Sequence, residues 1–149
     1  MDRRRTLLMI AAGTALAGCA PGRDDGPPQR PAAEPGSARI GADALMTAEG
    51  SFAATGPGAG SATGGVRVAR DRGEWLIETG PDFVVEGAEA PVLMLGDKGP
   101  QALLGPLAAG SGRQGFVVPN GLDIGDYLSV WVWCRAAERP VAVARLTLL

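Results

Sequence analysis

Cys19 and Cys134 carry the most reactive side chains of this 149-residue chain, and no histidine accompanies them. Without imidazole the chain cannot build a Ser-His-Asp or Cys-His nucleophile, a blue-copper site, or a His-ligated zinc or haem. Its carboxylates are scattered through segments typical of turns, where aspartate bonds to nearby backbone; examples are Asp71, Asp97, Asp123 and Asp126. A catalytic carboxylate pair is the open alternative. The sequence has no phosphate-cradling glycine motif, metal-spaced cysteine pair or calcium loop, so we expect no enzyme, cofactor or metal.

The first of these cysteines ends a pattern typical of a bacterial lipoprotein signal. Three arginines, Arg3–Arg5, precede an apolar run from Thr6 to Leu16, and the box Leu16-Ala17-Gly18-Cys19 follows. The run has the length of a signal peptide and is too short to span a bilayer. We expect residues 1–18 to be cleaved and Cys19 to carry the lipid anchor, with a second acyl signal because one chain binds membranes only weakly. An ordinary secretory signal with a coincidental cysteine is the alternative.

Lipidation predicts a membrane surface in the bacterial cell envelope, facing the periplasm. Ala20, directly after the lipidated residue, is not an acidic inner-membrane retention signal, which favours the outer membrane. Arg4 and Arg5 also fit a twin-arginine signal, although the general secretory route fits them equally well.

A proline-rich stretch separates the anchor from the rest of the chain. Residues 19–38 contain five prolines and predict a linker, so that one β domain spans residues 39–149. Loss of the signal takes the formal charge from −2 to −4, because three arginines and one aspartate leave with it. A mildly acidic surface disfavours a nucleic-acid partner.

Beyond the linker, short apolar runs alternate with Gly, Pro, Asn and Asp, which predicts an all-β antiparallel sandwich or barrel of about seven to nine short strands. The expected strands are Val66–Ala69, Glu74–Glu78, Phe83–Val85, Val92–Leu95, Gln114–Val118, Ser129–Cys134 and Val141–Leu146. Asp71-Arg72-Gly73 is expected to turn the chain between the first two. The glycine-rich stretch Gly56–Gly65 predicts a flexible loop, with a lid as the alternative.

The order of several short motifs across residues 50–147 resembles the DM-thirteen family, a domain of bacterial lipoproteins and of Skeletor-type animal proteins. The motifs are Gly80-Pro81-Asp82, Leu104-Gly105-Pro106-Leu107, Gly112-Arg113-Gln114-Gly115-Phe116-Val117-Val118-Pro119, and Trp131-Val132-Trp133-Cys134 after Asp123–Tyr127. The resemblance implies an electron-transfer module with a cytochrome-type or other redox partner, in which the cysteine after tryptophan, here Cys134, is the redox element.

The chain departs from the family pattern in two places. Family members often carry a histidine in the region of Gly58–Gly65, and this chain has none. Ala137 and Val141 stand where the family has aromatic residues after the cysteine. The resemblance therefore implies the fold and the cysteine, and no histidine chemistry.

The residues around Cys134 allow a second interpretation. With Cys19 lipidated, Cys134 is the only thiol and cannot form an intramolecular disulfide. Strand alternation places it with Val130 and Val132 and opposite Trp131 and Trp133, which favours an inert, buried cysteine. Arg135 points away on a strand and is a poor activator of the thiol.

The aromatic residues are expected to pack in the core, and Trp131 and Trp133 become a binding patch if no second layer covers them; the set is Trp75, Phe83, Phe116, Tyr127, Trp131 and Trp133. Tyr127 is expected to tie a corner through its hydroxyl. Three functions stay open: a redox accessory centred on Cys134, a non-catalytic module that binds a protein or apolar ligand, and a structural envelope lipoprotein. A lone thiol needs a second sulfur, a metal or a partner to handle electrons.

Overall fold

The computed structural model describes residues 34–58 and 60–149. In this part of the chain the regular structure is β-strand apart from one 3₁₀ turn, η1 (Ile124–Asp126). No helix there is long and apolar enough to cross a membrane. The predicted signal peptide, Cys19 and the linker up to residue 33 lie outside the described residues. The strands are β1 Leu45–Ala54, β2 Ser61–Thr63, β3 Gly65–Asp71, β4 Glu74–Thr79, β5 Val84–Glu86, β6 Pro91–Gly96, β7 Pro100–Pro106, β8 Gly115–Val117, β9 Ser129–Cys134, β10 Arg139–Arg145 and β11 Thr147–Leu148.

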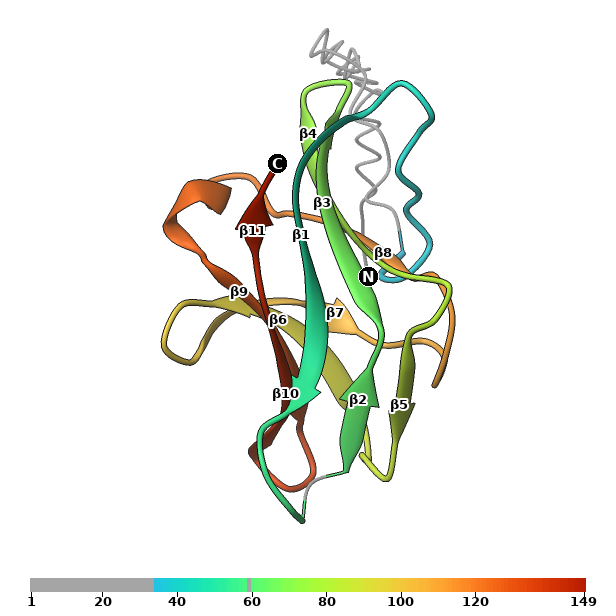
Figure 1. Ribbon diagram of the computed structural model, residues 1–149, viewed down its shortest axis with the longest axis vertical. Helices are drawn as coiled ribbons and strands as arrows, with labels where there is room; N and C mark the ends of the chain where they lie inside the picture. Colours follow the sequence, from blue (N-terminus) through green and yellow to red (C-terminus); the bar gives the residue numbers. More distant parts are fainter. Residues whose placement is uncertain (1–33, 59) are drawn as a thin grey trace, which may run out of the picture.

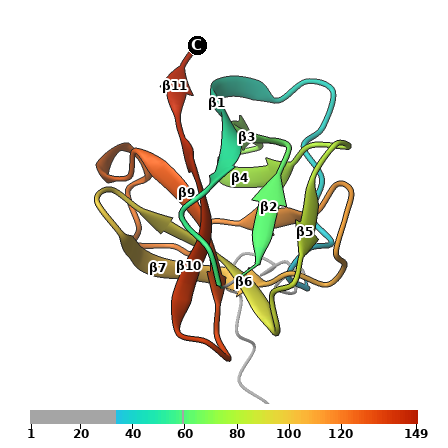
Figure 2. The same cartoon turned by 60° about the horizontal axis from the view of Figure 1, so that its bottom comes forward.

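One antiparallel sheet forms most of the molecule. Its order is β7-β6-β9-β10-β1-β3-β4-β8, and β11 pairs with β1 beside β10. The sheet curls until its two ends approach each other, which gives a nearly closed barrel (Figures 1 and 2). A second, two-stranded sheet of β2 and β5 lies at one end of it. The all-β fold predicted from the sequence is confirmed.

Alternation along the strands fills the barrel with small and medium apolar side chains. Val66 and Val68 of β3, Ile77 of β4 and Val130 and Val132 of β9 are almost completely buried. Phe83 and Phe116 are the largest buried apolar side chains, and Phe83 packs against Phe52 with ring centroids 5.4 Å apart. These two phenylalanines confirm the expected use of aromatics in the core.

The barrel has a seam between its two end strands, β7 and β8, which no ladder joins in the part of the chain that the structure describes. Residues 35–41, which we call the N-terminal strap, run beside β8 at this seam before the chain enters β1 (Figure 1). Gly36 is buried. Pro35 packs closely against Gly105 of β7, since a Cβ atom added at Gly105 would lie only 2.7 Å from the Pro35 side chain. The folded part therefore begins earlier than the predicted linker end at residue 38.

The predicted strands agree with the observed ones to within a few residues, and Ser129–Cys134 agrees at both ends. The expected turn lies between β3 and β4, where Arg72 and Gly73 both have positive φ, 52° and 86°. The glycine-rich stretch differs from its prediction as a loop. Its residues 61–63 form β2, because Ala62 is fully buried and pairs with Val85 of β5.

Candidate functional site

Cys134 ends β9 with its side chain inside the barrel. The residue is 3% exposed, and its thiol donates a hydrogen bond to the carbonyl of Glu89 over 3.1 Å. Glu89 belongs to the exposed loop between β5 and β6, which turns through Gly87 and Ala90 with φ of 70° and 50°. Among the described residues Cys134 is the only cysteine and is free. The sulfur is therefore a covered group whose S–H already has an acceptor.

Among residues 34–58 and 60–149 no arginine or lysine hydrogen-bonds to this thiol, whose partner is the Glu89 carbonyl. Arg135 is exposed, and its backbone N–H donates to the carbonyl of Ala90 over 3.4 Å. A thiolate forms readily only beside a cation, a histidine or a helix N-terminus. The local structure thus gives Cys134 the environment of a packing residue.

The opposite side of β9 is the outer surface of the barrel. Trp131 and Trp133 lie there, each half-buried, and the indole N–H of Trp131 donates to the hydroxyl of Ser129 over 3.0 Å. The Ser129 hydroxyl in turn donates to the carbonyl of Gly96 over 2.8 Å. This chain of bonds fixes one edge of the Trp131 ring and leaves the rest of the ring to contact its neighbours.

The ladder register extends these tryptophans into two transverse apolar rows, because directly opposed residues share one face of a sheet. One row crosses five strands and the other crosses four; the first is Leu103, Met94, Trp131, Val143 and Ala53, and the second is Pro106, Val92, Trp133 and Pro140. We call this surface the tryptophan face. None of its nine residues is charged; Leu103 at its rim is 50% exposed, and Val92 is buried at 2% exposed.

Tyr127 closes the corner before β9, although not through its hydroxyl as predicted. Its backbone N–H donates to the carbonyl of Ile124 over 3.1 Å, which ends η1, and its ring packs partly against the core. Among the described residues the hydroxyl has no hydrogen-bond partner. The 3₁₀ turn supplies the main-chain bond that the hydroxyl was expected to make, so the corner needs no side-chain tie.

Outside β9, the residues that carry the family resemblance hold separate turns, and in the described part of the chain none of them hydrogen-bonds to the Cys134 sulfur. Asp82, after Pro81, accepts the N–H of Gly65 over 3.1 Å at the turn that follows β4. Leu104 and Gly105 lie near the end of β7 at the seam. Pro119 follows β8 and accepts the N–H of Leu122 over 3.3 Å.

Gln114 has the most specific of these structural roles. Its Oε1 accepts the N–H groups of Ala108 and Ala109 over 2.8 and 3.1 Å, and its Nε2 donates to the carbonyl of Ala109 over 2.7 Å. Its own N–H donates to the hydroxyl of Thr79 over 2.8 Å. The buried amide therefore replaces the sheet bonds that the loop after β7 lacks.

Of the aspartates predicted to bond to nearby backbone in turns, Asp123 does so, whereas Asp71 ends β3 and bonds to a residue 30 positions away. Asp71 accepts the N–H of Gly41 over 3.1 Å, and Asp123 caps η1 by accepting the N–H of Gly125 over 2.9 Å. Asp97 lies in the turn between β6 and β7, and Asp126 ends η1.

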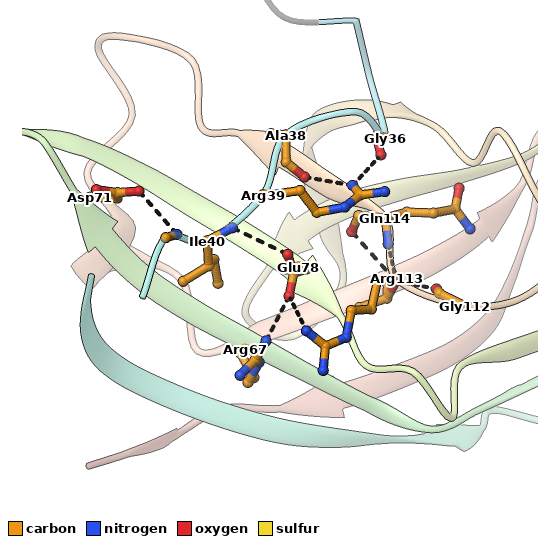
Figure 3. A network of polar contacts seen from close by, with 12 residues as sticks. Gly36, Ala38, Arg39, Ile40, Arg67, Asp71, Glu78, Gly112, Arg113 and Gln114 are labelled. Atoms are coloured by element: carbon orange, nitrogen blue, oxygen red, sulfur yellow. Dashed lines mark hydrogen bonds and ion pairs between the residues drawn. The ribbon is translucent and has the colours of Figure 1, made fainter. Parts of the chain in front are cut away.

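A buried carboxylate that the sequence did not single out lies on the outer side of β4. Glu78 is 1% exposed, and its Oε1 pairs with Nη2 of Arg67 at 2.6 Å and with Nη1 of Arg113 at 4.0 Å. Its Oε2 accepts the backbone N–H of Ile40 over 3.2 Å (Figure 3). The available signal was the hairpin register, which sets Glu78 directly opposite Arg67. Glu78 therefore links the N-terminal strap to β3 and β4 through its bonds to Ile40 and Arg67.

Among the cavities that open on the surface of the described residues, two have a volume of about 570 Å³ each. One lies beside the strap, β8 and Leu104, above the buried side chains of Leu76, Phe116 and Val118. The other is polar and lies between Glu49, Asp82 and the arginines Arg67, Arg113 and Arg145. Neither cavity is lined by Cys134 or by a tryptophan.

Comparison with known proteins adds no relative: no family model matches the chain, and no curated protein or solved structure matches it. The resemblance to the DM-thirteen family stays a prediction that rests on the order of its motifs.

Proposed function

We propose that this chain is a lipid-anchored protein of the bacterial cell envelope whose β domain is a non-catalytic module that binds another protein through the tryptophan face. The observation that carries the proposal is the pair of uncharged rows on the outer side of β6, β9 and β10. Contiguous apolar surface that stays in contact with water marks an interaction site more often than a scattered apolar residue does.

A protein partner suits this surface better than a small molecule. Small ligands bind in concave pockets that cover most of their surface, and both cavities lie away from the tryptophans. Tryptophan, methionine and other large side chains concentrate at the centres of protein interfaces, whereas charged residues are depleted there. Trp131, Trp133 and Met94 form such a centre.

The redox role that the resemblance implies is the alternative. It requires a reachable sulfur, and Cys134 is covered by the loop that contains Glu89. Electron transfer through this thiol would need that loop to move aside and a partner to supply the second redox group. The packing of β9 thus favours the binding module over the redox accessory.

Site-specific photocrosslinking tests the binding function. A photoreactive residue at Leu103 is expected to give one discrete protein adduct in cells that make the full chain. The adduct should disappear in the Trp131→Ser, Trp133→Ser double variant. The matched control position is Val84 of β5, which is 38% exposed and lies on the small sheet. Equal adducts at both positions, adducts that survive the double substitution, or adducts to lipid alone would contradict the proposal.

The anchor is tested separately by labelling with radioactive palmitate. The full chain is expected to take up label, and Cys19→Ser is expected to abolish it and release the protein from the membrane fraction. Cys134→Ser is the control and should keep the label. Label that persists in Cys19→Ser, or is absent from the unmodified chain, would overturn the lipid anchor while leaving the binding proposal intact.

A further inference from the structure

The N-terminal strap pairs with β8 at Gly115 and then turns away from the strand. Gly115 donates its N–H to the carbonyl of Gly36 over 3.2 Å, and Ala38 donates its N–H to the carbonyl of Gly115 over 3.3 Å. These two bonds make a parallel bridge between Ser37 and Gly115. In a continued ladder the next residue of β8 to bond would be Val117, with the carbonyl of Ala38 and the N–H of Ile40 as its partners.

Both of these strap groups are occupied elsewhere. The carbonyl of Ala38 accepts Nη1 of Arg39 over 2.7 Å, and the N–H of Ile40 donates to the buried carboxylate of Glu78 over 3.2 Å. Figure 3 shows Arg39 folded back on the strap carbonyls and Ile40 directed at Glu78. The strap therefore leaves the edge of β8 after two bridges to Gly115, an antiparallel one from Gly36 and a parallel one from Ser37, and crosses toward Asp71.

This departure leaves the backbone of Val117 open. The bonds between β8 and β4 run through alternate residues, since Gln114 accepts from Thr79 and Val118 donates to Trp75, each over 2.9 Å. Val117, like Gly115, consequently directs its N–H and C=O away from β4. Within residues 34–58 and 60–149 no backbone group bonds to Val117 on that side.

The open edge adjoins the cavity of about 570 Å³ beside the strap, whose lining is partly apolar and partly polar. Its floor is formed by Leu76, Phe116 and Val118, and Leu104 of β7 stands on the far side of the seam. The rim carries both signs of charge, from Arg39, Arg72, Asp71 and Glu74. A volume of this size is in the range of ligand pockets and accepts a large apolar side chain.

We propose that the edge of β8 at Val117 binds an extended peptide segment of a partner protein, which adds a strand in the seam and inserts one apolar side chain into the cavity. The occupant is a peptide because the open groups are one N–H and one C=O at strand spacing, which another backbone complements. The strap supplies a partial precedent, since the backbone of its residues 36–38 already bonds to the same edge at Gly115. This site lies on other strands than the tryptophan face and does not depend on it.

The test is selection of displayed heptapeptides on the full chain in detergent, with subtraction on the Val117→Pro variant. Proline removes the N–H on the open side, where β8 makes no bond to β4. We expect enriched peptides with β-branched residues and a large apolar residue. Synthetic versions should lose at least about tenfold in affinity when alternate peptide nitrogens are methylated, because methylation removes the bond to the edge and leaves the acceptor without a partner. Val117→Thr, which keeps the N–H, should bind as the unmodified chain does.

A second variant keeps the test decisive if Val117→Pro fails to fold. Asn120→Trp starts from an exposed rim residue and fills the cavity mouth, so it should block the peptide without disturbing the core. The proposal is overturned if no peptide survives subtraction, if binding ignores both Val117→Pro and Asn120→Trp, or if it is lost in Trp131→Ser, Trp133→Ser instead. A dimer that Val117→Pro dissolves would assign the edge to a second copy and would also overturn it.

Discussion

The two sides of β9 carry different kinds of residue and differ in exposure. On the inner side Val130, Val132 and Cys134 are at most 3% exposed, and the thiol already donates to a carbonyl. On the outer side Trp131 and Trp133 stay half-buried within rows of apolar neighbours. The residue with reactive chemistry is thus enclosed, and the residues with the largest apolar area face outward.

This arrangement reverses the usual use of tryptophan in a small β domain. The interior of an eight-stranded barrel has room only for side chains that interdigitate, and here valine, leucine and phenylalanine fill it. Trp131 and Trp133 therefore are not needed to complete the core. Their position outside, beside Met94 and Val143, makes the outer side the better candidate for function.

The largest expected effect on stability comes from a charge placed on the inner side of β9, compared with the same charge on its outer side. Val132→Asp places a carboxylate among fully buried apolar residues and is expected to cost about 4 kcal/mol or more, which leaves the chain unfolded. Trp133→Asp keeps its carboxylate in contact with water, so its cost should be about 1–2 kcal/mol. Urea unfolding followed by circular dichroism measures both. Equal losses would mean that β9 has no distinct inner side.

A smaller effect is expected at the thiol. In a Cys19→Ser background, Cys134 should react with a thiol reagent at least about 100-fold more slowly in the folded chain than in urea, because the sulfur is reached only by local opening. Cys134→Ala should cost about 1 kcal/mol through the small void it leaves.

The matched control moves the thiol to the outer side. Leu103→Cys in a Cys19→Ser, Cys134→Ala background should react at nearly the same rate folded and unfolded, since Leu103 is 50% exposed. Rapid reaction of the folded Cys134 thiol would instead favour the redox accessory over the binding module.

Much of the fold follows from local sequence, and the strands that escaped prediction share a physical reason. Strand β1 contains three alanines and one glycine, and its buried apolar residues are Ala48 and Phe52. Strand β7 begins and ends with proline, which is tolerated because β7 is a terminal strand of the sheet. Weak intrinsic propensity was overridden by pairing with distant strands, which a local pattern does not contain.

The features of the candidate site also fall into two groups: those that follow from one strand and those that depend on the order of strands in the sheet. Alternation predicted that Cys134 lies on the face of Val130 and Val132 and opposite Trp131 and Trp133, because that depends on one strand alone. Which of the two faces stays uncovered was left open by the sequence. Three other features depend on which strands are neighbours: the rows of the tryptophan face, the bonds of Glu78 to the N-terminal strap, and the open edge at Val117. Strand order is set by long-range packing, so these features emerged only with the structure.

The smallest expected effect on stability tests the outer side most directly. Trp133→Ser should cost about 1 kcal/mol, and Leu103→Ser about 0.5 kcal/mol or less, because both side chains are partly in water and leave no enclosed cavity. Trp131→Ser should cost slightly more than Trp133→Ser, since it also removes the bond to Ser129. If the tryptophan face exists to bind a protein, these substitutions must weaken the partner complex by more than they weaken the fold. A core role for either tryptophan would give the opposite ratio, so unfolding curves and crosslinking yields of the same variants decide between the two uses of β9.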